Sequence, residues 1–141
     1  YNIFLVEVCE GDAFLNDVSK ITNTPIIAID TPILAVGKIL ANSRVFISGR
    51  YHPAILSSLG GTPCIFMSSN SHKTRSVQEL LKYDEMKEYN VLPNEDEINE
   101  IVKKAREDIE KGEDLRKRIK ERCLKLSEET IKQKELLRSE K

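Results

Sequence analysis

Short apolar runs alternate with amphipathic segments along the first 92 residues of the chain. The runs are rich in Val, Ile and Phe, a composition typical of strands that are covered on both faces of a sheet. The segments between them repeat their apolar residues at helical spacing. The pattern predicts strands at residues 3–8, 25–29, 44–48, 63–67 and 89–92. It predicts helices between them, at residues 12–21, 31–41, 53–59 and 71–83.

Helix signals fall where the helices are predicted to begin and end. Thr31 can cap a helix that has Pro32 in its first position, and Pro53 suits the first turn of the following helix. Gly60-Gly61 would end that helix. The helix at 71–83 is expected to bury Val77, Leu80 and Leu81.

Strands that alternate with helices at this spacing form βαβ units, with parallel strands and right-handed connections. The predicted fold class is therefore α/β, a three-layer Rossmann-like parallel sheet of about five strands flanked by helices, with a long C-terminal helical tail. Residues 1–92 would form this core, and residues 93–141 would form a charged helical extension.

The extension is predicted to consist of two helices. It contains 14 Lys or Arg and 14 Asp or Glu, and its apolar residues form narrow stripes. The first stripe is Ile98, Ile101, Val102, Ala105 and Ile109. Gly112 breaks the pattern. The second stripe is Leu115, Ile119, Cys123 and Leu126. The simpler interpretation of the charge is a solvated face. Alternatively, the last, protruding helix packs against a further domain or pairs with a second copy as a homodimer.

Composition narrows the classes of function. The formal net charge of −1 gives no general attraction to nucleic acid or to an anionic membrane. No apolar run approaches the roughly 20 residues of a membrane span, so an integral membrane protein is not expected. Cys9, Cys64 and Cys123 lack the spacing of a disulfide framework or a zinc site, which favours reduced thiols, no metal and a cytoplasmic location. Because the chain begins at Tyr1 without a leader, we interpret it as part of a longer protein.

Arg50 and His52 are the strongest candidates for chemistry. They follow the predicted strand at 44–48, and ligands of parallel sheets bind outside the carboxyl ends of the strands. Arg50 can bind a carboxylate or phosphate through its planar guanidinium, and His52 can move a proton near neutral pH. The structural alternatives are a surface ion pair for Arg50 and a helix cap for His52.

A second loop, at residues 68–74, follows the predicted strand at 63–67 and should lie at the same edge. In this loop Lys73 can place a point charge on a phosphate, while Ser69, Asn70 and Thr74 line the site. Helix capping is the alternative role for such small polar residues.

Other polar residues have structural explanations that we favour. Gly60-Gly61 lies between a helix and a strand, so it is better explained as a helix stop than as a phosphate loop. Glu7, Asp12 and Asp30 fall near strand ends, where they can bind sugar hydroxyls or simply cap the backbone.

From Val45 to Lys73 the chain resembles the polysaccharide pyruvyl transferase family. The resemblance rests on the Arg50-Tyr51-His52 element after a strand, the small-residue helix at 54–59, Gly61-Thr62-Pro63 before a strand, and Lys73. It is good over residues 31–81 and only topological before them. It implies the C-terminal Rossmann-like domain of a two-domain enzyme in the glycosyltransferase-B arrangement.

The resemblance also implies an activity. Members of this family transfer a pyruvyl group from phosphoenolpyruvate to a sugar as a ketal, during synthesis of a surface polysaccharide, and the donor takes the place of a cofactor. Arg50 would hold the carboxylate or phosphate of phosphoenolpyruvate, and His52 would protonate its methylene carbon. The saccharide acceptor would bind largely to the missing N-terminal domain, so the fragment alone is expected to be inactive.

Two other functions remain open. One is a glycosyltransferase or epimerase that uses a nucleotide sugar, although the first acid after Met67 is Glu79, which weighs against a carboxylate for the ribose. The other is a non-catalytic domain that binds a saccharide or a protein partner.

Overall fold

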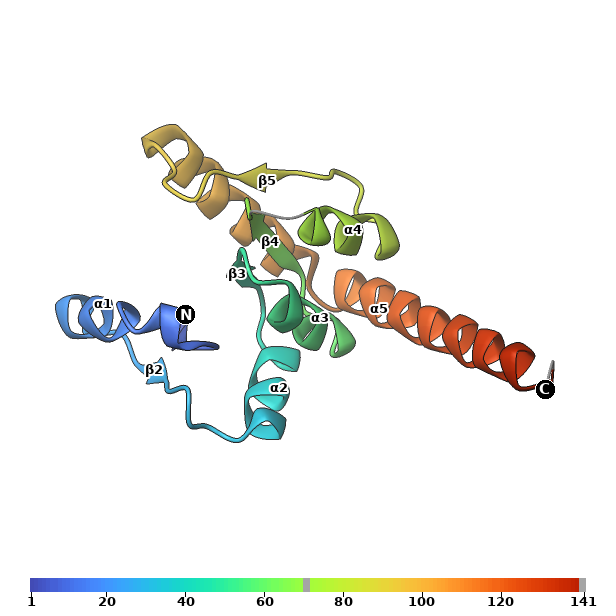
Figure 1. The fold of residues 1–141 in the computed structure, drawn as a ribbon. Helices are drawn as coiled ribbons and strands as arrows, with labels where there is room; N and C mark the ends of the chain where they lie inside the picture. The colour runs from blue at the N-terminus through green and yellow to red at the C-terminus, as the bar shows by residue number, and fades with distance from the viewer. Residues whose placement is uncertain (70–71, 140–141) are drawn as a thin grey trace. The chain divides into compact units, whose positions relative to one another are not determined.

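The computed structural model describes residues 1–69 and 72–139, with side chains as far as residue 135. The chain divides into two compact units, residues 1–39 and 40–141. Its elements, in chain order, are shown in Figure 1. They are β1 (Leu5–Val6), η1 (Glu10–Asp12), α1 (Leu15–Thr22), β2 (Ile26–Ile27), α2 (Ile33–Ala41), β3 (Phe46–Ser48), α3 (Tyr51–Leu59), β4 (Cys64–Met67), α4 (Lys73–Leu80), β5 (Glu88–Tyr89) and α5 (Glu95–Ser139).

The first unit contains one βαβ element. β1 and β2 pair in parallel, with Leu5 opposite Ile26 and Val6 opposite Ile27. α1 connects them and ends at Asn23, which adopts a left-handed conformation with φ of 53°. Asn is among the few residues that take this conformation readily, so the chain turns there into β2.

The second unit is built on a parallel sheet in the order β3-β4-β5. β4 is the central strand and pairs with β3 on one side and β5 on the other. Its side chains alternate between two hydrophobic clusters, as the pleat of a strand requires. Cys64 and Phe66 pack with Ala54, Val77 and Leu81 from α3 and α4 and the residue after α4. The neighbouring Ile65 packs on the opposite face.

α5 contributes to both faces of this sheet, which produces the three layers. Ile101 and Ala105, in its first half, pack with Ile65 and Tyr89. Cys123 and Leu126, in its second half, pack against the cluster of α3 and α4. Between the halves, Gly112 has φ of 54° and ψ of −131°, a conformation that only glycine adopts without strain. Figure 1 shows the two halves meeting at this break.

Arg116 fastens α5 at the edge of the sheet where the strands begin. Its guanidinium donates to the carbonyl oxygens of Ala41 (2.9 Å), Ser43 (2.5 Å) and Gly60 (3.1 Å), and lies 3.3 Å from the Thr62 hydroxyl. Ala41 ends α2, and Gly60 follows the last residue of α3. A cation at helix C-termini satisfies carbonyls that have no intrahelical partner and stabilises the helix dipole.

Most of the predicted architecture is confirmed. The α/β class, the five parallel strands, the long C-terminal helix and the helix stop at Gly60-Gly61 agree with the structure. The break at Gly112 is present, and Leu115 and Ile119 of the second apolar stripe are buried. The strands form separate sheets of two and three strands, and the paired segments are shorter than the apolar runs. The division at residue 92 stays a prediction.

Two details of the prediction are wrong. Leu80 is 48% exposed, because the buried side of α4 consists of Thr74, Val77 and Gln78, and Leu81 follows the helix. The last strand is Glu88–Tyr89 rather than 89–92, and Leu92 is 91% exposed. The polar Thr74 and Gln78 can be buried because their side chains have hydrogen-bond partners at the start of β5. Thr74 donates to Glu88, the first residue of β5, and the Gln78 oxygen accepts from the N–H of Lys87, the residue before it.

Replacing Arg116 with methionine should destabilise the chain, because three partly buried carbonyl oxygens would lose their donor. We expect the free energy of unfolding to fall by about 2–4 kcal/mol, since each unsatisfied buried group costs about 1–3 kcal/mol. Urea unfolding of the full chain, followed by circular dichroism, would measure this.

The matched control is Arg118→Met on the same helix. Arg118 pairs with Asp84 at 2.9 Å, but both side chains are at least half exposed. Removing such a surface pair should cost less than about 1 kcal/mol. Equal losses for the two variants would contradict the anchoring role of Arg116.

Candidate functional site

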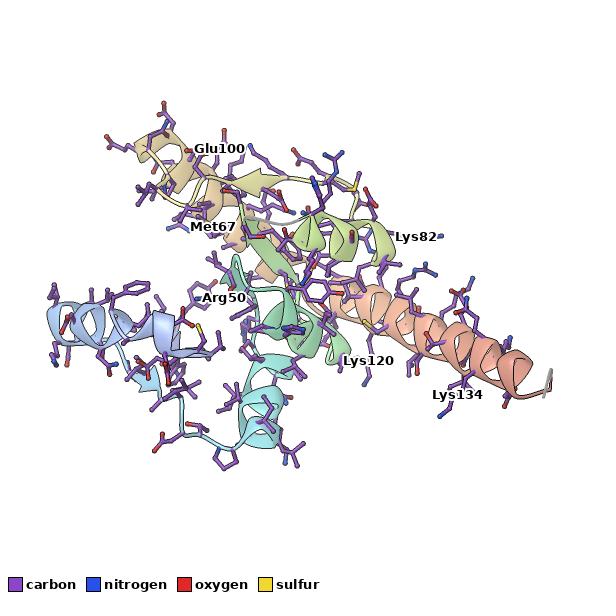
Figure 2. All side chains as sticks on the ribbon, in the orientation of Figure 1. Arg50, Met67, Lys82, Glu100, Lys120 and Lys134 are labelled. Atoms are coloured by element: carbon purple, nitrogen blue, oxygen red, sulfur yellow. The ribbon has the colours of Figure 1, made fainter. Side chains whose placement is uncertain are left out.

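The ends of β3 and β4 bring the predicted site residues to one edge of the sheet. Because the strands are parallel neighbours, with Ser48 opposite Phe66, the segments that follow them leave the sheet at the same edge. Arg50 comes directly before α3, and Lys73 is the first residue of α4. Figure 2 shows Arg50 and Met67 beside these strand ends.

Gly49 allows the two strand ends to approach closely. A Cβ at this position would lie 3.3 Å from the carbonyl oxygen of Met67 and 3.4 Å from that of Ser68. A side chain would therefore push the loop before Arg50 away from the loop after β4. The N–H of Arg50 donates to the Ser48 hydroxyl (3.0 Å), which holds the turn into α3.

Tyr51 joins residues from the two loops. Its ring contacts the imidazole of His52 in an edge-to-face arrangement, with centroids 5.2 Å apart and an angle of 76° between the rings. The Lys73 ammonium lies over the same ring, 6.0 Å from its centroid. Arg50, His52 and Lys73 are all exposed. The site therefore presents a guanidinium, an ammonium and an imidazole to solvent.

The other predicted ligand-binding residues lie in different surroundings. Ser69 follows β4 and is partly buried. Thr74 is fully buried, and its hydroxyl donates to the carboxylate of Glu88 at β5. Asn70 lies outside the described residues. The roles proposed for these residues stay predictions.

Sequence reasoning missed Tyr51 and Gly49. The sequence places Tyr51 in the middle of the Arg50-Tyr51-His52 element and Gly49 where the apolar run ends, but it assigns no role to either residue. Their position is the one feature of the sequence that could have indicated a role, because a glycine and an aromatic residue flank an arginine at a strand end. Their effect depends on a neighbouring strand, and the sequence gives no distance between strand ends.

The layer beneath the site is the hydrophobic cluster against which Tyr51 packs. At its centre, burial raises the pKa of the Cys64 thiol from 9.0 to about 11. Ser57 Oγ lies 3.0 Å from its sulfur and partly offsets the effect of burial. The Tyr83 hydroxyl accepts from the N–H of Cys64 (2.8 Å), and burial also raises the pKa of Tyr83. A thiol held protonated in this way is a packing group rather than a nucleophile.

The acidic residues of the first unit have structural partners. The Glu7 carboxylate accepts from the Asn16 amide and from the N–H of Ile29 (3.2 Å), linking the ends of β1 and β2. Asp12 accepts from the N–H of Val8 (3.1 Å). These bonds favour the capping interpretation for both residues. Within residues 1–69 and 72–139, no group of three or more His, Cys, Asp or Glu side chains is arranged to hold a metal ion.

The fold is that of an α/β protein, and it brings Arg50, His52 and Lys73 to the carboxyl edge of a parallel sheet, where such sheets bind their ligands. The sequence model of the family described as polysaccharide pyruvyl transferase matches residues 1–72, just over half of the chain. The chain therefore belongs to the polysaccharide pyruvyl transferase family. No curated protein and no solved structure matches it.

The match confirms the family and extends the resemblance back to Tyr1. It includes Arg50, His52 and Ser69, and it ends just before Lys73. The family name describes a transferase of polysaccharide synthesis and implies a saccharide acceptor. None of the helices in the described part of the chain has both the length and the apolar character needed to cross a bilayer.

The stability of the chain should fall at alkaline pH through Cys64. Its folded-state pKa is raised, so its contribution is complete below the unfolded value of 9.0 and is lost as pH rises through about 11. We expect the free energy of unfolding to drop by about 1–3 kcal/mol between pH 8 and pH 11 from this group, at about 1.4 kcal/mol per pKa unit. Urea unfolding at the two pH values measures the drop.

Cys64→Ala should reduce this drop, while the contribution of Tyr83 remains. Cys9→Ala, in the other unit, is the control and should keep the full drop. An unchanged drop in Cys64→Ala would show that the buried thiol does not titrate as described.

Proposed function

We propose that the chain is the C-terminal domain of a ketal-forming pyruvyl transferase that uses phosphoenolpyruvate as donor. The observation that carries the proposal is the grouping of Arg50, His52 and Lys73 at one edge of a parallel sheet, in a chain of the pyruvyl transferase family. Phosphoenolpyruvate carries a carboxylate and a phosphate, and each needs a cationic partner. Arg50 and Lys73 supply two.

His52 is the proposed acid. It would protonate the methylene carbon of phosphoenolpyruvate, which turns that carbon into a methyl group and leaves the adjoining C2 electrophilic. One hydroxyl of the sugar adds to C2, phosphate leaves with its bridging oxygen, and a second hydroxyl of the same sugar closes the ketal. In total, a sugar diol and phosphoenolpyruvate are converted to a pyruvate ketal of the sugar and inorganic phosphate. An exposed imidazole at the mouth of the site is suited to general acid catalysis.

The position of α3 favours an anionic donor. α3 begins at Tyr51, directly after Arg50, so its N-terminal backbone groups point toward the edge where the guanidinium lies. Helix N-termini carry a partial positive charge that favours anions. The arginine, the lysine and the helix N-terminus therefore all contribute positive potential, which attracts an anion.

The proposal includes a second domain and a cytoplasmic location. We infer that the saccharide acceptor binds mainly to an N-terminal domain, as in the two-domain arrangement that the resemblance implies. The isolated chain would then lack half of the cleft and show no turnover.

The alternative donor is a nucleotide sugar. The segment after β4 has no acidic residue before Glu79, so a carboxylate for ribose hydroxyls is missing where the alternative needs one. Binding of a uridine nucleotide in place of phosphoenolpyruvate would favour this second function.

Calorimetric titration of the full-length protein with phosphoenolpyruvate, and separately with uridine nucleotides, tests the proposal. Arg50→Ala should weaken phosphoenolpyruvate binding about ten- to hundredfold, because a charge-assisted hydrogen bond contributes about 1.5–3 kcal/mol. His52→Ala should leave binding intact and lower the transfer rate by about 10²- to 10⁴-fold.

Arg44→Ala is the matched control. Arg44 is exposed and precedes β3, so it lies at the opposite edge of the sheet from Arg50. Its replacement should leave binding and transfer unchanged. Small, equal effects of the Arg50 and His52 changes would remove the support for this site.

A further inference from the structure

Tyr51 is the residue that physically connects the two loops of the candidate site. It is the first residue of α3, directly after the β3 loop, yet the ammonium of Lys73, the first residue of α4 after the β4 loop, lies over its ring. The same ring meets His52 edge-on. No other described aromatic ring contacts both strand ends in this way.

The ring of Tyr51 is held in place by the hydrophobic cluster against which it packs. Tyr51 is partly buried and packs against the cluster that contains Ala54, Cys64 and Phe66. The close approach of Gly49 to the backbone of Met67 and Ser68 sets the spacing between the loops. The aromatic face is therefore a fixed surface, whereas Lys73 ends in a flexible chain that is exposed to solvent.

A fixed aromatic face restrains a lysine ammonium. The negative face of the ring attracts the cation, and an exposed pair of this kind is worth a modest amount of free energy. Holding the chain in one place also reduces the rotamer entropy that a lysine loses when it binds a ligand. The ring covers one side of the ammonium, and its N–H groups on the other side can still donate to an anion.

We propose that Tyr51 is a positioning residue that holds Lys73 for the phosphate group of phosphoenolpyruvate, an inference that rests on the proposed function. Arg50, which precedes the ring in the chain, then serves the carboxylate. Tyr51 does not touch the reacting atoms in this scheme. It acts through Lys73, so its removal should affect the phosphate end of the donor alone.

The assignment of the phosphate to Lys73 and of the carboxylate to Arg50 can be tested with two probes. Phosphoenolpyruvate has a carboxylate and a phosphate, whereas pyruvate has only the carboxylate. In the full-length protein, Tyr51→Leu should weaken phosphoenolpyruvate binding about two- to fivefold, the size expected for one exposed cation–π contact. Pyruvate binding should be unchanged. Tyr51→Phe keeps the ring and should bind both probes like the wild type.

A double-mutant cycle separates this role from a structural one. Lys73→Met should weaken phosphoenolpyruvate binding, and adding Tyr51→Leu should then have no further effect. Additive effects, or equal weakening of pyruvate and phosphoenolpyruvate by Tyr51→Leu, would overturn the role of Tyr51 and leave the proposed function intact. If the wild-type protein binds no phosphoenolpyruvate, both the proposed function and the role of Tyr51 are wrong.

Discussion

The parallel pairing of β3 with β4 is the constraint on which the second unit depends. It gives the sheet two chemically different edges, because every strand begins at one edge and ends at the other. At the edge where strands end, the pairing brings together Tyr51, the first residue of α3, and Lys73, the first residue of α4. At the edge where strands begin, it brings the end of α3 beside the end of α2, where Arg116 bonds to both. An antiparallel pair would mix these two sets of residues.

Contacts that stabilise the fold lie at the edge where the strands begin, and the candidate site lies at the edge where they end. Arg116 and the second half of α5 hold α3 by its C-terminal end and by its packed face. The N-terminal end of α3 is left to present Arg50 and His52 to solvent. A rigid helix with one anchored end can keep its other end in a fixed position at a ligand site. The break at Gly112 is what allows a single helix to cover one face of the sheet and still reach α3 on the other.

The sequence predicted what depends on local pattern and on strand polarity. Apolar periodicity located the strands and helices, and the rule for parallel sheets placed Arg50, His52 and Lys73 at one edge. It could not predict what depends on three-dimensional contacts. Thr74 resembles a solvent-facing loop residue, but its partner Glu88 lies on the next strand. Leu80 fits the apolar pattern of α4, but the buried side of that helix is partly polar because Lys87 and Glu88, at the start of β5, supply hydrogen-bond partners. Arg116, one of many charged residues in the tail, gives no signal of its contacts with residues 41–62.

The exposure of the candidate site affects how strongly it could bind the proposed donor. Two unit charges 4 Å apart attract by about 1 kcal/mol in water but by about 4 kcal/mol at an effective dielectric constant of 20. Arg50 and Lys73 are exposed, so their attraction for an anion is screened on the open side. A surface that closes over this edge would strengthen both interactions at once and would exclude water from the proposed cationic intermediate at C2. The proposed two-domain arrangement would provide such a surface. The second domain would therefore contribute to donor binding by lowering the dielectric constant around Arg50 and Lys73, as well as by holding the sugar.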